Sequence, residues 1–455
     1  MAETDPADRL SSAPGTFVVI LVGLLPLPMS MSGASIAIPH IGSDLDTGGA
    51  AAQWVVTGYF LTASVLMIVT GTLADALGRR RIYRWGALVY ATGSLLAAMA
   101  PSINVLLAAR IVTGAGAAGV MASGGAILAA TFTGAARTRA FAAMGAMAGL
   151  GLALGPSASG WIIEGLGWRA GFAIFAVAAL GLFAGTWLMR ESRAAVPRKR
   201  ARLLGDAGPV GGLLVLLRDR RFSGWVLAAV IMSIGYGGAL AFLPSYLQSP
   251  GGRSAGETGL IMLLPTVPMI VLPTLAGKLV NLGVRPAMLI TVALLLLGLG
   301  NAWLTVLHPD LTVATVTGPL LTLGAGVGLA AGIIDAQAMD RIDTDRAGLA
   351  AGLLNTVRAG ANSLVLAVFG ATLVGLLGIT VGSSELAGRV ATGNLPVDGG
   401  AMLAGHLTRA WRIALLGLAA VCGIGAIITA ALVRQGRGHD GRRSSPARSR
   451  RHSAV

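Results

Sequence analysis

GTLADALGRRR, residues 71–81, is the stretch from which the fold of this chain can be predicted. It ends an apolar run from Trp54 to Leu73 that is long enough to cross a bilayer. Gly78 then allows a sharp turn into four closely spaced arginines, at positions 79, 80, 81 and 84. A basic turn directly beside an apolar span predicts a short cytoplasmic connection between two membrane helices.

The composition excludes a soluble globular protein. Of the 455 residues, 55% are hydrophobic and only 12% are charged, which is too little charge to coat a water-facing surface of that size. The 66 glycines are typical of membrane helices that approach one another closely. We therefore expect an integral membrane protein.

The formal net charge of +15 does not indicate a nucleic-acid partner. The arginines cluster in alternate loops and at the chain ends, beside the apolar spans, and no basic face carries interleaved aromatic residues. The single cysteine, Cys422, lies inside an apolar run, so neither a disulfide framework nor a cysteine-based metal site is predicted. No cofactor is expected.

Twelve apolar runs have about the length, roughly 20 residues, that crosses a bilayer. They are Phe17–Ile38, Trp54–Leu73, Ile82–Ala100, Val105–Phe132, Ala140–Ile163, Ala170–Met189, Trp225–Leu247, Gly259–Val280, Ala287–Leu307, Thr312–Ile334, Leu349–Leu377 and Ile413–Val433. We therefore predict an all-α membrane protein with 12 transmembrane helices.

These spans divide the chain into five parts, two of them six-helix bundles. The bundles are expected at 15–190 and 222–433, a basic cytoplasmic linker with one short interfacial helix at 191–221, and disordered cytoplasmic ends at 1–14 and 434–455. Most lysines and arginines fall on the side of both termini, which places both termini in the cytoplasm. The opposite side holds only Arg169, Arg253, Arg389, Arg409 and Arg412.

The two halves share an internal repeat at a shift of about 205 to 207 residues. Its four matches pair Gly71-x-Leu73 with Gly277-x-Leu279, Arg79 with Arg285, Pro39 with Pro244, and Arg139 plus Gly145 with Arg346 plus Gly352. Chance could supply one such match, whereas four at one spacing indicate a duplicated unit.

The pattern G-x-L-x-D-x-x-G-R-R, carried by Gly71, Asp75, Gly78, Arg79 and Arg80, resembles the signature between helices 2 and 3 of major facilitator superfamily transporters. That fold is also built from six-helix repeats, with the substrate site between the halves near mid-membrane. The resemblance implies that the Asp75 carboxylate, at a helix end near the arginines, helps to hold the inward gate shut. Ordinary solvation of a helix end is the alternative.

Three further stretches resemble the drug:proton antiporter branch of this family. Residues 106–118, LLAARIVTGAGAA, look like the helix 4 signature with its intramembrane arginine, Arg110, and the resemblance implies a role in proton coupling. Residues 151–160, GLALGPSASG, look like the helix 5 antiporter signature, followed by Trp168-Arg169 and Phe172 as in exporters. Residues 352–358, GLLNTVR, resemble helix 11.

The helix 5 stretch has a physical meaning of its own. Gly151, Gly155 and Gly160 permit close helix packing, and Pro156 removes a backbone hydrogen bond and should bend the helix. A role as a conformational switch is compatible with that packing.

A polar stripe marks the predicted eleventh helix. Asn355, Arg358 and Asn362 fall at i, i+3 and i+7 and share one face. At 1.5 Å per residue, Arg358 lies roughly 18 Å in from Arg346, near the bilayer midplane. An ionisable group there costs at least about 2.5 kcal/mol, so we expect the stripe to face the central cavity or another helix. Substrate binding or coupling, and pairing with backbone carbonyls, remain alternatives for Arg358; a purely structural pairing also remains open for Arg110.

The carboxylates fit the resemblance less well. Related antiporters often begin L-D-x-T-x-x-x-x-A-L-P in helix 1, whereas the corresponding run, residues 29–39, has Ser30 in place of the acid. Glu164 and Asp335 are the nearest acids, and both are expected at a membrane interface. Proton coupling thus rests on resemblance, and a cavity with Arg358, Arg110 and no buried acid would favour anionic or zwitterionic amphiphiles.

Other classes are less consistent with the sequence. No G-x-x-x-x-G-K-[ST] loop supports an ATP-driven pump, no acid, base or metal constellation inside the spans supports an enzyme, and no repeated polar ring supports a channel. Uptake of an anionic metabolite and a transporter-like membrane sensor remain open.

We predict a secondary transporter that exports small amphiphilic molecules, such as drugs or secondary metabolites, by alternating access in exchange for protons. It is expected to be a monomer in the plasma membrane of a bacterium. Its expected partners are the small-molecule substrate, protons and lipid.

Overall fold

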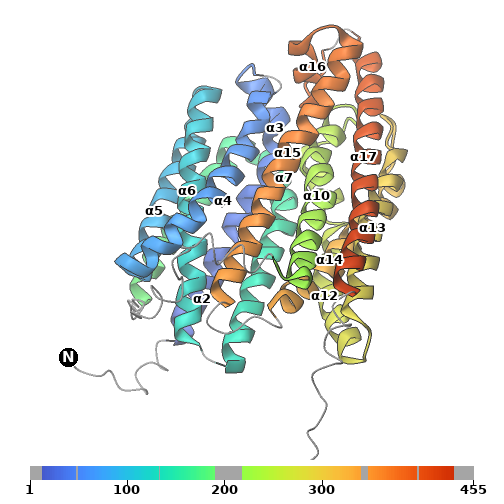
Figure 1. Ribbon diagram of the computed structural model, residues 1–455. Helices are drawn as coiled ribbons and strands as arrows, with labels where there is room; N and C mark the ends of the chain where they lie inside the picture. Colours follow the sequence, from blue (N-terminus) through green and yellow to red (C-terminus); the bar gives the residue numbers. More distant parts are fainter. Residues whose placement is uncertain are drawn as a thin grey trace, which may run out of the picture.

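The computed structural model describes residues 13–47, 50–132, 134–189, 218–339, 347–396 and 399–434, and within these ranges every regular element is a helix (Figure 1). Most of the predicted terminal segments and linker lie outside the described residues, as do the side chains of Asp75 and Asn355. An all-α protein is therefore confirmed.

The first half of the chain contributes six α-helices and one short 3-10 helix. They are α2 (Ala13–Leu24), α3 (Pro26–Asp44), α4 (Ala50–Leu77), α5 (Arg79–Ala98), α6 (Ile103–Thr131), α7 (Gly134–Gly185) and η1 (Thr186–Leu188). Leu25 separates α2 from α3, where Pro26 occupies the first turn of the following helix. Helix α7 carries two of the predicted spans, joined at Gly167, whose φ of 80° is readily adopted only by glycine.

The second half contributes the remaining helices. They are α10 (Arg220–Gln248), α11 (Ala255–Ile261), α12 (Thr266–Asn281), α13 (Pro286–Trp303), η3 (Leu304–Val306), α14 (Val313–Met339), α15 (Ala347–Val381), α16 (Ser384–Ala391) and α17 (Gly400–Arg434). Helix α10 starts at a capping carboxylate, because Asp219 Oδ1 accepts from the backbone N–H of Arg221 at 2.8 Å.

Nine stretches of the described chain are long and apolar enough to cross a membrane. Three differences separate this number from the twelve predicted spans. The two arms of α7 form one continuous stretch, the apolar part of α4 covers only Ala51–Met67, and α5 begins with a cluster of arginines. The chain is thus a multi-pass membrane protein, and the count of twelve crossings stays a prediction.

The prediction for the last span was too short. The apolar run was expected to begin at Ile413, but α17 begins at Gly400 and includes Arg409 and Arg412, which were expected on the outer side. The two arginines interrupt the apolar run but not the helix, because alanine, leucine and arginine all have high helix propensity. The short amphipathic helix α16 was not predicted.

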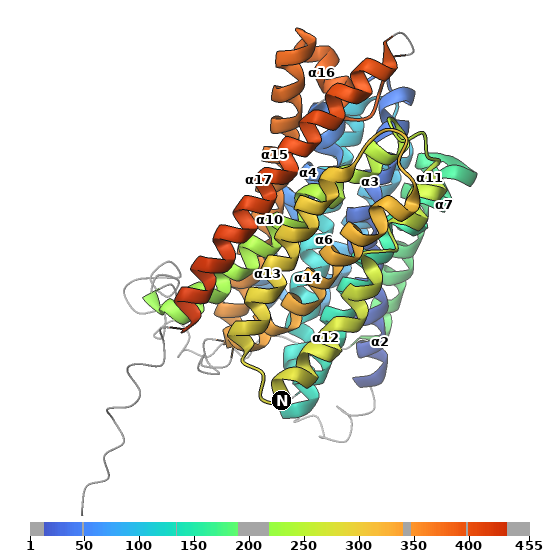
Figure 2. The ribbon, with the colours of Figure 1, turned by 90° about the vertical axis from the view of Figure 1, so that its right-hand side faces the viewer.

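Helices pack mainly within each half. In the first half α5 packs on α6 and α7, and α3 packs on α7; in the second, α13 packs on α14 and α17. Figure 1 shows this division, with α5 and α6 on the left and α13 and α17 on the right. The halves meet mainly where α7 contacts α11, α4 contacts α15 and α3 contacts α10. Figure 2 shows α11 beside α7 in the upper part of the bundle.

The internal repeat is visible in two turns. Gly78, between α4 and α5, has a φ of 113°, and Gly283, between α12 and α13, has a φ of 93°. Both positions lie in the left-handed region that favours glycine. We call the end of the bundle with Gly78 and the arginines that follow it the basic end, and the opposite end, which carries α16, the α16 end (Figure 1).

Candidate functional site

Arg110 of α6 is fully buried, at 0% exposure. Its Nε donates to the Val55 carbonyl of α4 at 2.9 Å, and its Nη1 donates to Ser30 Oγ of α3 at 3.2 Å. The ring centroids of Tyr59 and Phe172 lie 4.4 and 5.4 Å from its Cζ. Residues from α3, α4, α6 and α7 therefore converge on one guanidinium.

The Arg110 charge is balanced by dipoles and ring faces. A carbonyl, a hydroxyl and two aromatic rings each offset part of the cost of burying a cation. Within the described chain no carboxylate forms an ion pair with Arg110. Ser30, which replaces the acid of related sequences, is thus the direct partner of this arginine, a pairing that the sequence analysis did not identify.

Arg358 of α15 pairs with a carboxylate. Its Nη2 lies 2.8 Å from Asp335 Oδ1 of α14, and the two side chains are 23% and 55% exposed. Asp335 is close to Met339, where the described part of α14 ends, so the Arg358 guanidinium reaches toward the basic end. The predicted preference for anionic substrates assumed a cavity without a buried acid; the Asp335 side chain is largely exposed, and the preference stays a prediction.

Asn362 of the polar stripe faces a neighbouring helix. Asn362 is half-buried beside Gly237 of α10, where an added Cβ would lie 3.0 Å from Asn362 Oδ1. This position agrees with the expectation that the stripe faces either a cavity or another helix. The role of Asn355, whose side chain is not described, stays a prediction.

The predicted gating motif ties together elements of the first half. Arg79 Nη1 donates to the Ala126 carbonyl of α6 at 2.9 Å, and Arg80 Nε donates to the Thr186 carbonyl of η1 at 2.8 Å. Gly71 faces α6, with the Ala122 Cβ at an ordinary 3.9 Å from an added Cβ. The gating role of these residues and of Asp75 stays a prediction.

The helix 5 motif packs closely on two different helices. A Cβ added at Gly151 would lie 2.6 Å from the Leu25 carbonyl oxygen, and one added at Gly155 would lie 2.7 Å from the Met29 carbonyl oxygen. Both contacts are on the α3 side. At Gly160 an added Cβ would lie 3.1 Å from the Gly259 Cα of α11, in the other half. Close packing is confirmed, because side chains at these positions would overlap the neighbouring backbone.

Pro156 lies inside α7, within the same motif. The next residue, Ser157, donates from Oγ to the Gly259 carbonyl at 2.7 Å, so the motif also makes a polar contact between the halves. A switch role for the motif stays a prediction.

Several polar contacts between distant residues were missed. Gln248 Nε2 donates to the Ile36 carbonyl at 3.1 Å, and Asp46 pairs with Arg389 at 3.1 Å. Asp44 forms an ion pair with Arg169. The only sequence signal for these residues is a polar side chain at the end of a span, which does not identify the partner.

Among the described residues, no cluster of histidine, cysteine, aspartate or glutamate could hold a metal ion. Aromatic side chains of the second half pack within its core: the ring centroids of Phe242 and Phe369 lie 5.2 Å apart, and those of Tyr246 and Trp411 lie 5.5 Å apart.

Similar proteins are named for drug resistance. The chain is 27% identical to the multidrug resistance protein Stp of Mycobacterium tuberculosis, over 84% of this chain and 78% of that protein. It is 29% identical to the puromycin resistance protein pur8 of Streptomyces alboniger, over 79% and 81% of the two chains. A methylenomycin A resistance protein of Streptomyces coelicolor is 27% identical over 82% of this chain and 88% of the relative.

Solved structures support the fold. A bacterial homolog of the human lysosomal transporter Spinster, in an inward-facing and unoccupied conformation, superposes with a TM-score of 0.70 at 16% identity, covering 95% of this chain and 98% of that one. The family model of the major facilitator superfamily matches residues 20–366. The chain therefore belongs to the major facilitator superfamily, a family of membrane transporters and not of enzymes.

Proposed function

We propose that this transporter exports small amphiphilic molecules across a bacterial plasma membrane, by alternating access and in exchange for protons. The similarity to resistance proteins over about four fifths of the chain carries this proposal, because a transporter that confers resistance must move the compound out of the cell. The helix 5 motif supports it, since its glycines pack α7 both on α3 and, across the halves, on α11.

The proton would be carried by a carboxylate. Arg110 stays charged at any physiological pH and cannot release a proton. Asp335 is ionisable and forms an ion pair with Arg358 at 2.8 Å. Protonation of Asp335 would weaken that attraction, which makes the Asp335–Arg358 pair our candidate for linking proton binding to movement of α14 and α15.

Arg110 would have a different part in the cycle. It holds α6 against α3 and α4 through Ser30 and Val55, at 3.2 and 2.9 Å. A fixed cation at this place favours a compact first half and sets the electrostatic potential that a substrate meets. It is thus expected to affect substrate binding more than proton linkage.

Efflux from bacteria that lack their own drug exporters tests this function. Cells carrying the transporter should accumulate less puromycin and less lipophilic dye than cells without it, and a protonophore should abolish the difference. Asp335→Asn should also abolish it, whereas Glu257→Gln, an exposed carboxylate outside the ion pair, should not. Faster accumulation in cells that carry the transporter would instead indicate uptake.

A further inference from the structure

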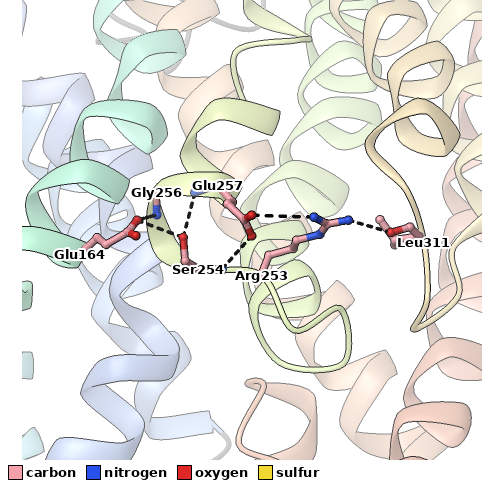
Figure 3. Close-up of polar contacts among 6 residues, drawn as sticks. All are labelled: Glu164, Arg253, Ser254, Gly256, Glu257 and Leu311. Carbon is pink, nitrogen blue, oxygen red and sulfur yellow. Dashed lines mark hydrogen bonds and ion pairs between the residues drawn. The ribbon is translucent and has the colours of Figure 1, made fainter.

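Glu164 of α7 bonds to the opposite half of the transporter. One of its oxygens, Oε2, accepts from the backbone N–H of Gly256 at 2.6 Å and from Ser254 Oγ at 3.0 Å (Figure 3). Glu164 lies three residues before the kink at Gly167, and Gly256 lies in the first turn of α11. These bonds therefore cross between the halves at the α16 end.

The receiving segment is shaped for this carboxylate. An N–H in the first turn of a helix has no partner within that helix, and Gly256 is buried, so Glu164 satisfies a donor that water reaches poorly. A Cβ added at Gly256 would overlap Glu164 Oε2. Glycine at position 256 is thus what allows the carboxylate to approach.

The segment around Ser254 is itself held rigidly. Ser254 Oγ accepts from the Glu257 N–H at 3.1 Å, and Glu257 Oε2 accepts from the Ser254 N–H at 3.2 Å, which forms a capping box. Arg253 lies 3.9 Å from Glu257 and donates to the Leu311 carbonyl at 3.0 Å, as Figure 3 shows. Glu164 consequently meets a preformed site and not a loose loop.

Other contacts between the halves surround the Glu164 bonds. Ser157 Oγ donates to the Gly259 carbonyl at 2.7 Å, and Gln248 Nε2 donates to the Ile36 carbonyl at 3.1 Å. Asp46, just beyond α3, pairs with Arg389 of α16. The halves therefore meet at the α16 end through several polar bonds beside a shared apolar cluster, and the polar bonds are the contacts that must break when this end opens.

We propose that Glu164 is a positioning residue that holds the α16 end of the transporter closed. Its bonds to Ser254 and Gly256 must break each time that end opens, so they set how often this end opens. The proposal rests on the alternating access described above, but it concerns the closed state and can be tested without any transported compound.

Labelling of a buried cysteine tests the proposal. Ser157 is buried at the contact between α7 and α11, and the natural cysteine, Cys422, can be removed, so Ser157→Cys in a Cys422→Ala background gives one reporter. A membrane-impermeant thiol reagent is applied to intact cells and to inverted vesicles, and the labelling rate is measured on each side. Opening of the α16 end exposes the reporter from the side that this end faces.

Three variants break the Glu164 bonds to different extents. Glu164→Ala and Gly256→Ala should raise the labelling rate by about three- to tenfold, the range expected for a charge-assisted bond at an exposed carboxylate. Glu164→Gln keeps an acceptor oxygen and should fall between these variants and the parent. The matched control is Glu385→Gln, which alters an exposed carboxylate in the first turn of α16 at the same end of the bundle, and its labelling rate should equal that of the parent.

Two results would overturn the proposal. One is an unchanged labelling rate in both Glu164→Ala and Gly256→Ala, measured on both sides of the membrane. The other is a rise in Glu385→Gln as large as that in Glu164→Ala. Faster labelling in a protein that exports nothing would refute the proposed function while supporting the role of Glu164.

Discussion

Arg110 shows what a single residue contributes to this fold. Its guanidinium satisfies the Val55 carbonyl and Ser30 at once, a geometry that lysine cannot reproduce with one ammonium group. Arg110→Lys should therefore lower the melting temperature of the purified protein by several degrees and reduce efflux by roughly tenfold. Thermal unfolding in detergent and dye efflux in cells measure these effects.

Arg412 provides the control for Arg110. It also lies in a long helix, but its one bond is from Nη2 to the Leu307 carbonyl at the α16 end, at 3.0 Å, and its side chain is exposed. Arg412→Lys should leave melting temperature and efflux close to those of the parent. Equal effects of both substitutions would contradict the special role of Arg110.

Gly155 tests close packing at the helix 5 motif. A Cβ there would lie 2.7 Å from the Met29 carbonyl, and backbone cannot move aside as a flexible side chain can. Gly155→Ala should cost about 1 to 3 kcal/mol and lower the melting temperature. Gly181→Ala, in the same helix with no atom within 4 Å, should be neutral or slightly stabilising. A stable Gly155→Ala variant would show that α7 and α3 can separate easily.

At the scale of single residues, the sequence shows which residues are unusual but not which residues they contact. Ser30 could be singled out because it replaces an acid of related sequences, and Arg110 because it interrupts an apolar span. Their contact could not be predicted, because they are 80 positions apart and hydropathy does not show which helix faces meet. Glu164 was expected to be merely solvated, since its partner is 92 positions away.

An ion pair between Asp335 and Arg358 links helices α14 and α15. Replacing either partner should leave the other charge partly buried, so Asp335→Asn and Arg358→Gln should each destabilise the protein. The double variant should lose less free energy of unfolding than the two single variants together. We expect a coupling energy of about 0.5 to 1 kcal/mol, because the pair is partly exposed. Thermal unfolding of the four proteins measures this coupling, and additive effects would contradict a direct interaction in the membrane.

At the scale of elements, apolar periodicity locates most helices but not their ends. The turn at Gly78 was predictable, because glycine followed by arginines is a strong local signal. The continuity of α7 through Gly167 was not predictable, because the stretch between its two arms contains polar and charged residues that are typical of a loop. The start of α17 at Gly400 was missed for the same reason.

On the scale of the whole molecule, the halves are joined both by a shared apolar cluster and by polar bonds at the α16 end. The duplicated architecture could be predicted from the repeat of about 206 residues, and the similarity to solved transporters supports it. The contacts that close the α16 end could not be predicted, because they join residues from distant parts of the sequence. Examples are Glu164 with Gly256 and Asp46 with Arg389.

Proton flux through the reconstituted transporter tests the central claim most directly. Proteoliposomes with an imposed pH gradient are given puromycin, a cationic dye and an anionic amphiphile in turn, and the internal pH is followed. We expect at least one compound to drive proton movement in the parent and in Glu257→Gln but not in Asp335→Asn. Movement of a compound down its own gradient, with no proton flux in the parent, would contradict proton exchange and identify a facilitator.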